Sequence, residues 1–600
     1  MSDYRAPVAD MRFVLDHIVG LDELAALEGL EAAAPDTVDA VLAEAARLAG
    51  EVLAPLNRVG DAQRSVIEGG EVTTPDGFKE AYRLFVEGGW NGIMFDSAIG
   101  GQGLPWAVST AVTEMWESAN LAFSLLPILT QAAVACLAQA GSPAQKETYL
   151  PKLVSGEWAG TMNLTEPHAG SDVGALTTRA VREGARYRIT GTKIFVTFGE
   201  HDLAENIVHL VLARTPGAPP GTRGISLFIV PKFLVGADGS LGARNDLRAV
   251  SLEHKLGIHA SPTAVMSYGD EGGAIGYLVG EECEGMSAMF IMMNTARLAV
   301  GLEGLGIAER AYQQALAYAR ERCQGRAFGA DARQASPIVE HPDVRRMLML
   351  MKAGNEAMRA LAYSVGGAID RAARHPDEAE RRRHAAFVEL MTPVVKGWCT
   401  DLGVELTSLG VQVHGGVGYI EETGAAQHFR DARIAPIYEG TNGIQAFDLV
   451  MRKLPRDGGA AVRRVIADIK AIDADLAAAN DAHFVPLRGA LADAAGAFEE
   501  ASAWLIARTR DDPRAAAAGA TPYLRLFGTV YGGFQLARGA LAARAALADA
   551  AAGDGGFMRA KIATARFYAE QVLAPAPAML RSITAGTEAL FDIEPELMSL

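Results

Sequence analysis

The sequence predicts a mainly helical chain with a central β-barrel, followed by an additional helical domain. Three observations predict this fold. Apolar residues recur at three- and four-residue spacing before residue 160, short runs of β-branched and aromatic residues follow, and long helical patterns return after residue 285. Six hundred residues are too many for a single hydrophobic core, so we expect several domains.

The first expected domain, residues 1–160, is helical with a short N-terminal extension. Its clearest helical pattern is "DTVDAVLAEAARLAGEVLAPLNRVG", and the Gly/Pro-rich "IGGQGLP" (99–105) separates two helices. Residues 118–145 carry no charge, but Pro127, Thr130 and Gln131 interrupt them. This interruption favours buried core helices over a membrane span.

The second expected domain, residues 161–284, is a β-barrel. Its predicted strands are 186–199, 207–214, 224–231, 264–270 and 275–280. No segment between them is long enough for a helical crossover, so we expect antiparallel pairing.

Two further helical domains complete the prediction. Residues 285–455 have small and apolar residues spaced for close helix packing, as in a helical bundle. Residues 456–600 are Ala-rich and amphipathic, which is typical of a separate helical domain.

Composition excludes several classes of protein. The net charge of −17 disfavours a nucleic-acid-binding protein, which needs a basic face. Four scattered cysteines form no C-x-x-C pair, so neither a disulfide framework nor a metal site is expected, and a reducing cytoplasm fits. The first twenty residues mix acids and bases, unlike a signal peptide.

Nucleotide-binding G-x-G-x-x-G and Walker motifs, the zinc motif H-E-x-x-H and the serine motif G-x-S-x-G are absent. What remains are glycine-containing polar loops at 162–178, 193–199 and 410–422. In the second, Phe195 and Thr197 share a strand face, so a ring can stack on one and hydrogen-bond the other. Together the loops indicate a bulky ligand with apolar and phosphate parts.

Glu439 is a lone carboxylate in "IYEGTNGIQ" (437–445), a stretch that reads as a loop or a helix start. Burial in an apolar loop raises the pKa of a carboxyl group toward neutrality, which suits a general base. The structural alternative is a carboxylate that caps the following helix.

Three motifs resemble the acyl-CoA dehydrogenase flavoprotein family. They are "LTEPHAGSD" (164–172), "GVQVHGGVGYIEETGAAQHFRDARIAPIYEGTNGIQ" (410–445) and the hairpin "GGWNGIMFDSAIGGQGLP" (88–105). Their order and spacing agree with the family across roughly residues 40–455. The resemblance implies a helical, β-barrel, helical core that binds one FAD per subunit.

The resemblance also implies FAD-binding residues. Phe195 takes the place of the usual tryptophan, although a plain core role is an even alternative, and Thr197 faces flavin N5. Arg322 and Arg326 remain alternatives for the pyrophosphate contact, because "RERCQGRAFG" has extra residues relative to the family pattern. The full expected set is Met162, Leu164, Thr165, Gly170, Ser171, Phe195, Thr197, Arg322, Arg326, Phe328, Gln412, Gly415, Gly416 and Thr441.

For catalysis, the resemblance implies that Glu439 removes the pro-R C2 proton of an acyl-CoA while hydride leaves C3 for flavin N5. The Glu439 N–H and a ribityl hydroxyl would polarise the thioester carbonyl. Some members place the base at the position that is Ala296 here, and alanine cannot serve. The expected substrate-binding residues are Ser171, Asn294, Arg297, Tyr438 and Gly440, with Asn294 replacing a common aspartate.

The chain's ends resemble a bacterial subgroup that includes methylmercaptopropionyl-CoA dehydrogenases and enzymes for short, medium or long fatty acyl chains. Expected partners are an acyl-CoA substrate and electron-transfer flavoprotein, in a cytoplasmic homodimer without nucleic acid or stable membrane insertion. The extra C-terminal domain is the reason for expecting a dimer rather than a tetramer. Alternatives are an acyl-CoA oxidase that uses O2 and a non-catalytic flavin-holding protein associated with nucleic acid.

Overall fold

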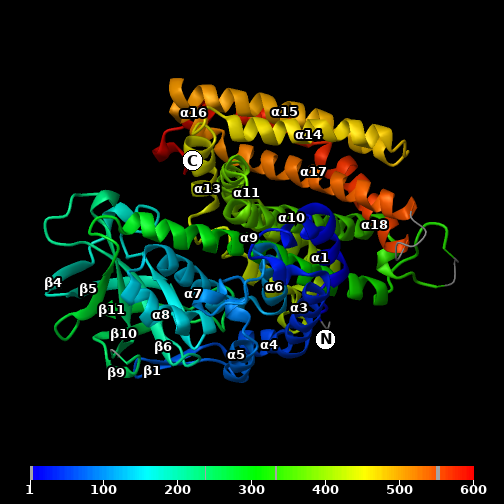
Figure 1. Cartoon of the computed structure of the whole chain (residues 1–600). Helices are drawn as coiled ribbons and strands as arrows, with labels where there is room; N and C mark the ends of the chain where they lie inside the picture. Colours follow the sequence, from blue (N-terminus) through cyan, green and yellow to red (C-terminus); the bar gives the residue numbers. More distant parts are fainter. Residues whose placement is uncertain (1–3, 237, 331–333, 549–554, 600) are drawn as a thin grey trace. The chain divides into compact units, whose positions relative to one another are not determined.

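A computed structural model describes residues 4–236, 238–330, 334–548 and 555–599 (Figure 1). Residue contacts divide the chain into two compact units. The first holds the chain up to Ala43, Pro105–Glu114 and the chain from Val300 onward; the second holds Glu44–Leu104 and Met115–Ala299. The division into four domains expected from the sequence is finer and stays a prediction.

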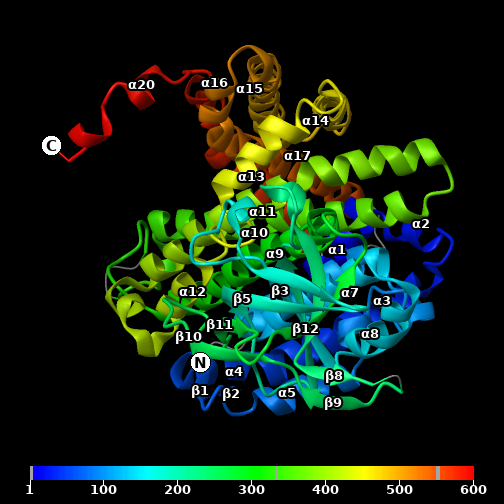
Figure 2. The ribbon, with the colours of Figure 1, turned by 90° about the vertical axis from the view of Figure 1, so that its left-hand side faces the viewer.

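The second unit contains an eight-stranded sheet, in the order β10-β11-β5-β12-β7-β6-β3 with β4 beside β5 (Figure 2). The strands are β3 (Trp158–Asn163), β4 (Arg179–Glu183), β5 (Arg186–Thr197), β6 (Asn206–Ala213), β7 (Ser226–Pro231), β10 (Leu247–Leu252), β11 (Thr263–Tyr268) and β12 (Ala274–Val279). Two-stranded sheets are formed by β1 (Val66–Glu68) with β2 (Glu71–Thr73), and by β8 (Phe233–Val235) with β9 (Leu241–Arg244).

All five strands expected from β-branched runs are present as β5, β6, β7, β11 and β12. Among the paired strands that the structure describes, neighbours are antiparallel except β3, which runs parallel to β6 from Trp158 beside Asn206 to Asn163 beside Val211. Strand β5 pairs with β12 near its start and with β11 near its end, so the sheet curls around it. Side chains such as Val211, Phe228 and Met266 fill the inner face as a buried apolar cluster.

The helices of the second unit support the sheet. They include α4 (Ala54–Gln63), α5 (Phe78–Glu87), α7 (Leu121–Ala140) and α8 (Pro143–Ser155). Asn120 caps α7 through Phe123 N, and α7 packs along β3. Both α7 and α9 (Gly285–Glu321) have the length and composition of a membrane span, but the apolar window of α7 is 83% buried in the protein. The expectation of a core helix at 118–145 is confirmed.

The first unit is helical. Its helices are α1 (Val8–Val14), α2 (Leu21–Ala25), α10 (Pro342–Arg374), α11 (Glu378–His414), α12 (Ala425–Ala432), α13 (Asn442–Asp448), α14 (Ala460–Ala478), α15 (Phe484–Asp511), α16 (Pro513–Ala518), α17 (Ala520–Ala548), α18 (Gly555–Tyr568), α19 (Met579–Ile583) and α20 (Glu588–Phe591). Three helices, α3 (Pro35–Leu48), α6 (Trp106–Ala119) and α9, continue from one unit into the other.

The C-terminal helices pack on the bundle through small residues. Glycines on α17 lie against the indole of Trp398 on α11: a Cβ at Gly528 would come within 2.1 Å of that ring, and one at Gly532 within 3.0 Å. The α17 backbone therefore approaches α11 as closely as only glycine allows.

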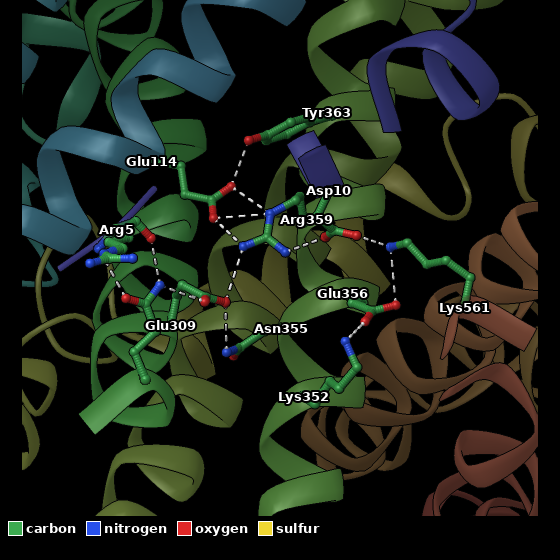
Figure 3. Close-up of polar contacts among 11 residues, drawn as sticks. Arg5, Asp10, Glu114, Glu309, Lys352, Asn355, Glu356, Arg359, Tyr363 and Lys561 are labelled. Carbon is green, nitrogen blue, oxygen red and sulfur yellow. Dashed lines mark hydrogen bonds and ion pairs between the residues drawn. The ribbon is translucent and has the colours of Figure 1, made fainter. Parts of the chain in front are cut away.

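A buried cluster of charges joins segments of the first unit that are far apart in sequence (Figure 3). Arg359 on α10 donates to Glu114, with Nε–Oε1 at 3.0 Å, and also to Asp10 on α1 and Glu309 on α9. Lys561 on α18 donates to Asp10 and to Glu356. Each carboxylate is paired with a cation, as buried charges require.

Candidate active site

Glu439 lies in the loop between α12 and α13, in the first unit. Its φ is 57°, and Gly440 after it has a φ of 78°. Two successive left-handed residues turn the chain sharply, and the first is not glycine. A left-handed conformation costs such a residue about 1–2 kcal/mol and persists only where its surroundings enforce it.

The loop is fixed from its C-terminal side by α13. Gln445, which is fully buried, donates from Nε2 to the carbonyl oxygens of Glu439 at 3.0 Å and Gly440 at 3.1 Å. Thr441 is the N-cap of α13, with its hydroxyl accepting from Ile444 N at 3.3 Å. The expected loop or helix start is confirmed. Since Thr441 holds the cap position, the capping alternative for Glu439 loses its support.

Asn442, the first residue of α13, ties the loop to α11. Its Oδ1 accepts from Lys396 Nζ at 2.7 Å, and its Nδ2 donates to Gly397 O, Thr400 Oγ1 and Asp401 Oδ1. Asn442 and Lys396 are both buried. These bonds set the position of the loop relative to the bundle.

Tyr438 fixes the loop from the other side. Its hydroxyl donates a hydrogen bond to Oε2 of Glu303 on α9, 135 residues earlier in the chain. The loop around Glu439 is therefore held by three helices, α9, α11 and α13, on both sides of Glu439. Such a rigid support is what a catalytic group needs to keep its orientation.

In the second unit, the loop after β3 is held by a buried ion pair. Lys193 on β5 donates from Nζ to Glu166 at 2.8 Å and to the carbonyl oxygen of Leu164 at 3.0 Å. Both charged side chains are at most 2% exposed. Thr177 and Thr178 also donate to Glu166 through their amides and hydroxyls, so the carboxylate receives five hydrogen bonds.

The charge states of this pair follow from these contacts. Burial opposes ionisation of Glu166, but the charge of Lys193 and the hydrogen bonds outweigh it and lower the pKa of Glu166 to about 2. Burial lowers the pKa of Lys193 to about 8 against the pull of Glu166, which leaves the pair ionised at neutral pH.

Phe195 and Thr197 flank the buried Val196 near the end of β5. A β-bulge interrupts the pairing of β5 with β11, and Phe195 within it has a φ of 57°. Val196 between them is buried, whereas Phe195 is 57% exposed and Thr197 is partly exposed. The expected shared face stays a prediction, whereas the core alternative for Phe195 is wrong because its side chain is largely exposed.

The remaining expected residues of the second unit lie along β3, the loop after it and α9. Met162 is on β3, and Leu164 and Thr165 follow it, with Thr165 O accepting from Ile194 N at 2.9 Å. Gly170 and Ser171 are exposed, and a Cβ at Gly170 would meet no atom within 4 Å. Of these residues, Gly170 and Ser171 are therefore the most accessible to a ligand.

On α9, Arg297 donates from Nη1 to Asn294 Oδ1 at 3.3 Å, one helical turn away. Arg297 is buried and Asn294 is exposed. The structure therefore brings these two expected substrate residues together.

The other expected residues belong to the first unit. Arg322, Arg326 and Phe328 follow α9 and are exposed, Phe328 at 96%. Gln412 is exposed near the end of α11, and Gly415 with φ 63° ends that helix beside Gly416. A Cβ at either glycine would meet nothing within 4 Å.

Sequence reasoning missed the supporting residues Glu166, Lys193, Glu303, Lys396, Asn442 and Gln445. Glu303 had a sequence signal: it is the single charge in "LAVGLEGLGIA", an apolar helical run. Glu166 and Lys193 stand inside the motif loops but are 27 residues apart, and no local pattern pairs them. Among the described residues, no group of three or more His, Cys, Asp or Glu side chains is arranged to hold a metal ion.

Family models of acyl-CoA dehydrogenases match the chain in sequence order. They are the N-terminal domain at residues 36–157, the middle domain at 161–270, the C-terminal domain at 284–454 and the acetyl-CoA dehydrogenase C-terminal-like domain at 465–594. These matches cover both the barrel and the additional helices.

Individual proteins agree with these models. A 3-methylmercaptopropionyl-CoA dehydrogenase of Ruegeria pomeroyi is 50% identical over 588 residues, 98% of this chain and 99% of its own. Among solved structures, ACDH-11 of Caenorhabditis elegans in complex with C11-CoA has a TM-score of 0.75 at 20% identity, covering 98% of this chain and 96% of its own. An acyl-CoA dehydrogenase of Bacillus anthracis complexed with FAD has a TM-score of 0.73 at 20% identity, covering 98% and 93%. The chain therefore belongs to the acyl-CoA dehydrogenase family of oxidoreductases.

Proposed function

We propose that the chain binds FAD and oxidises the C2–C3 bond of a saturated acyl-CoA to a trans-2-enoyl-CoA, with Glu439 as the base. The observation that carries the assignment of the base is the left-handed, anchored conformation of Glu439 in a chain of this family. An enforced backbone outlier points to a residue whose orientation matters for function.

The chain offers residues that fit FAD. Phe195 presents an exposed ring on β5, and the partly exposed Thr197 two residues later offers a hydroxyl, groups that suit a planar heterocycle. The open backbone at Gly170, Gly415 and Gly416 admits close approach of a ligand. The residues proposed to hold FAD are Met162, Leu164, Thr165, Gly170, Ser171, Phe195, Thr197, Arg322 or Arg326, Phe328, Gln412, Gly415, Gly416 and Thr441.

When bound, FAD supplies the acceptor for the hydride that leaves C3 of the substrate. Glu439 accepts the proton from C2, so the substrate loses one proton and one hydride and gains the double bond. The Glu439 N–H donates to the thioester carbonyl, which acidifies C2. The left-handed turn lets one residue present its carboxylate and its amide to the same substrate.

The substrate belongs to the acyl-CoA thioesters, with Ser171, Asn294, Arg297, Tyr438 and Gly440 in contact with it. We propose 3-methylmercaptopropionyl-CoA as the first candidate, because a relative with that activity matches nearly the whole chain. Short-, medium- and long-chain fatty acyl-CoAs are the alternatives within the same reaction.

Electrons pass to electron-transfer flavoprotein, and the enzyme works in the cytoplasm as a homodimer. Support for a dimer is the additional helical domain at residues 465–594, because such a domain is expected to occupy the place where a second dimer would otherwise pack. An oxidase would instead pass the electrons to O2. Slow reoxidation of the reduced flavin in air would favour the dehydrogenase, and fast reoxidation would favour the oxidase.

The decisive experiment is anaerobic flavin bleaching in the Glu439→Gln variant. We expect the rate of bleaching by the best acyl-CoA to fall by about 10²–10⁴, the contribution of a general base, with FAD still bound. Glu405→Gln is the control, because Glu405 is an exposed glutamate on α11 paired with Arg525. Bleaching at the normal rate by the Glu439 variant would refute the assignment of the base.

The substrate is identified by the same bleaching measured with a panel of saturated acyl-CoAs, including 3-methylmercaptopropionyl-CoA. The thioester that bleaches the flavin fastest names the acyl group. If no member bleaches a flavin that is retained, the proposed dehydrogenation is refuted for this panel.

A further inference from the structure

Glu303 is a buried acid on α9. It contacts the loop that carries Tyr438 and the proposed base Glu439, called the base loop below. It is 1% exposed. Its Oε2 accepts the hydrogen bond from the Tyr438 hydroxyl, and its Oε1 has no hydrogen-bond partner among the residues that the structure describes. A buried carboxylate with one oxygen unpaired is costly, because its charge is not compensated. A protonated carboxyl group is neutral and avoids this cost.

The groups around Glu303 come from α11 and the base loop. Helices α9 and α11 cross closely at glycines: a Cβ at Gly304 would lie 2.3 Å from Cys399 O, and one at Gly403 2.6 Å from Gly304 O. At this crossing, Cys399 of α11 lies against α9, and the charge of Lys396 acts on Glu303. Asp401, also on α11, accepts a hydrogen bond from Asn442. From the loop, the Tyr438 hydroxyl contacts Glu303, and Glu439, the next residue, acts on it through its charge.

These surroundings decide the charge of Glu303. Burial raises its pKa most, the Tyr438 hydrogen bond and Lys396 oppose that, and the charge of Glu439 raises the pKa again, to about 8. Burial also raises the pKa of Cys399, which keeps that thiol neutral. At neutral pH Glu303 is therefore protonated while it touches the neighbour of the base.

We propose that Glu303 is a positioning residue that holds Tyr438 and sets the strength of Glu439 as a base through the charge it gains at alkaline pH. This inference rests on the proposed role of Glu439. Coupling between two ionisable groups is reciprocal: the charge of Glu439 disfavours ionisation of Glu303, so ionised Glu303 must raise the proton affinity of Glu439.

The direction of the effect follows from this coupling. Proton removal from C2 neutralises Glu439, and an anion beside it favours that neutralisation. Once Glu303 ionises, Glu439 is a stronger base and flavin bleaching is faster. A one-unit rise in the pKa of the base corresponds to about a threefold faster proton transfer at a Brønsted coefficient near one half.

The first measurement detects the Glu303 proton directly. Infrared difference spectra of the FAD-loaded enzyme, recorded from about pH 6 to about pH 10, should show a buried carboxyl C=O band that disappears with a midpoint near 8. The band should be absent in Glu303→Gln. In Tyr438→Phe its midpoint should move to higher pH, because the lost hydrogen bond lowered the pKa of Glu303. An unchanged band in Glu303→Gln would overturn the proposal.

The second measurement is the rate of anaerobic bleaching over the same pH range. The normal enzyme should show an alkaline rise of about threefold. Glu303→Gln keeps an acceptor for Tyr438 but cannot ionise, so it should lose this rise. Glu303→Leu lacks both properties, and its maximal rate should fall below that of Glu303→Gln. Equal pH profiles in the normal enzyme and Glu303→Gln would overturn the coupling.

The two proposals fail in different ways. If Glu439→Gln bleaches normally, the assignment of the base is refuted. If Glu439→Gln is inactive while Glu303→Gln keeps both the infrared band and the alkaline rise, only the role of Glu303 is refuted.

Discussion

Glu166 in the second unit and Glu303 in the first are both buried glutamates that support a loop with proposed functional residues, yet they hold opposite charge states. Glu166 receives hydrogen bonds from Lys193, Thr177 and Thr178, and its pKa falls to about 2. Glu303 accepts from Tyr438 but leaves one oxygen without a partner, and its pKa rises to about 8. Burial is common to both; the number of donors decides which form is stable.

The two loops therefore differ in whether their supporting glutamate changes its charge near neutral pH. The loop after β3 is held by an ion pair that does not titrate near neutral pH, which suits a static surface. The base loop is held by Glu303, whose raised pKa lets it gain or lose a proton near physiological pH.

The largest effect should follow from breaking the ion pair with Lys193→Met. This change leaves the Glu166 charge buried without its cation, and we expect the free energy of unfolding to fall by about 3–5 kcal/mol. Denaturant titration measures the loss, and FAD retention should fall with it because Leu164 O loses its donor. Lys470→Met, at an exposed pair with Glu499, should change stability by about 0–1 kcal/mol. A Lys193 variant as stable as this control would contradict the comparison.

The pH dependence of stability should distinguish the two glutamates by sign. The pKa of Glu166 is lowered, so its contribution is complete above about 4.5 and is lost as the pH falls through about 2. The pKa of Glu303 is raised, so its contribution is complete below about 4.5 and is lost as the pH rises through about 8. Unfolding free energies measured against pH should therefore flatten on the acid side in Glu166→Gln and on the alkaline side in Glu303→Gln. The same side in both variants would refute the assignment of opposite charge states.

The smallest effect should come from Glu303→Leu at neutral pH. A protonated carboxyl is replaced by an apolar side chain of similar volume, so no buried charge loses its partner and the total cost should stay at about 1–2 kcal/mol. The Tyr438 hydroxyl loses its acceptor, which accounts for about 1 kcal/mol of this. A loss as large as that of Lys193→Met, measured by the same denaturant titration, would mean that Glu303 is ionised in the folded protein.

Local patterns predicted most of the fold. β-branched runs located β5, β6, β7, β11 and β12, and an uncharged apolar run located the buried helix α7. Strand β3, "WAGTMN", escaped prediction because small residues dominate it and its parallel pairing with β6 is set by contacts distant in sequence. For the same reason, only antiparallel pairing was expected between the strands of this domain.

The candidate site was predictable where one residue stands out locally. Glu439 is conspicuous as a lone acid in an apolar loop, and glycine, threonine and asparagine beside it predicted the helix start. Its left-handed φ and its anchors were not predictable. Periodicity places Glu303 within an apolar helix, but its contact with Tyr438 spans 135 residues, a separation that no sequence period encodes.

The buried charge cluster of Figure 3 has a consequence for how the chain folds. Asp10 pairs with Arg359 and Lys561, which lie 349 and 551 residues further along the sequence. The helix that carries Asp10 can therefore bury its carboxylate only together with segments that are distant in the chain. Without the Lys561 ammonium group, Asp10 would keep Arg359, and Glu356 would keep Lys352, as cation partners. Helix α18 thus gives both acids a second cation in a network that α10 already neutralises in part.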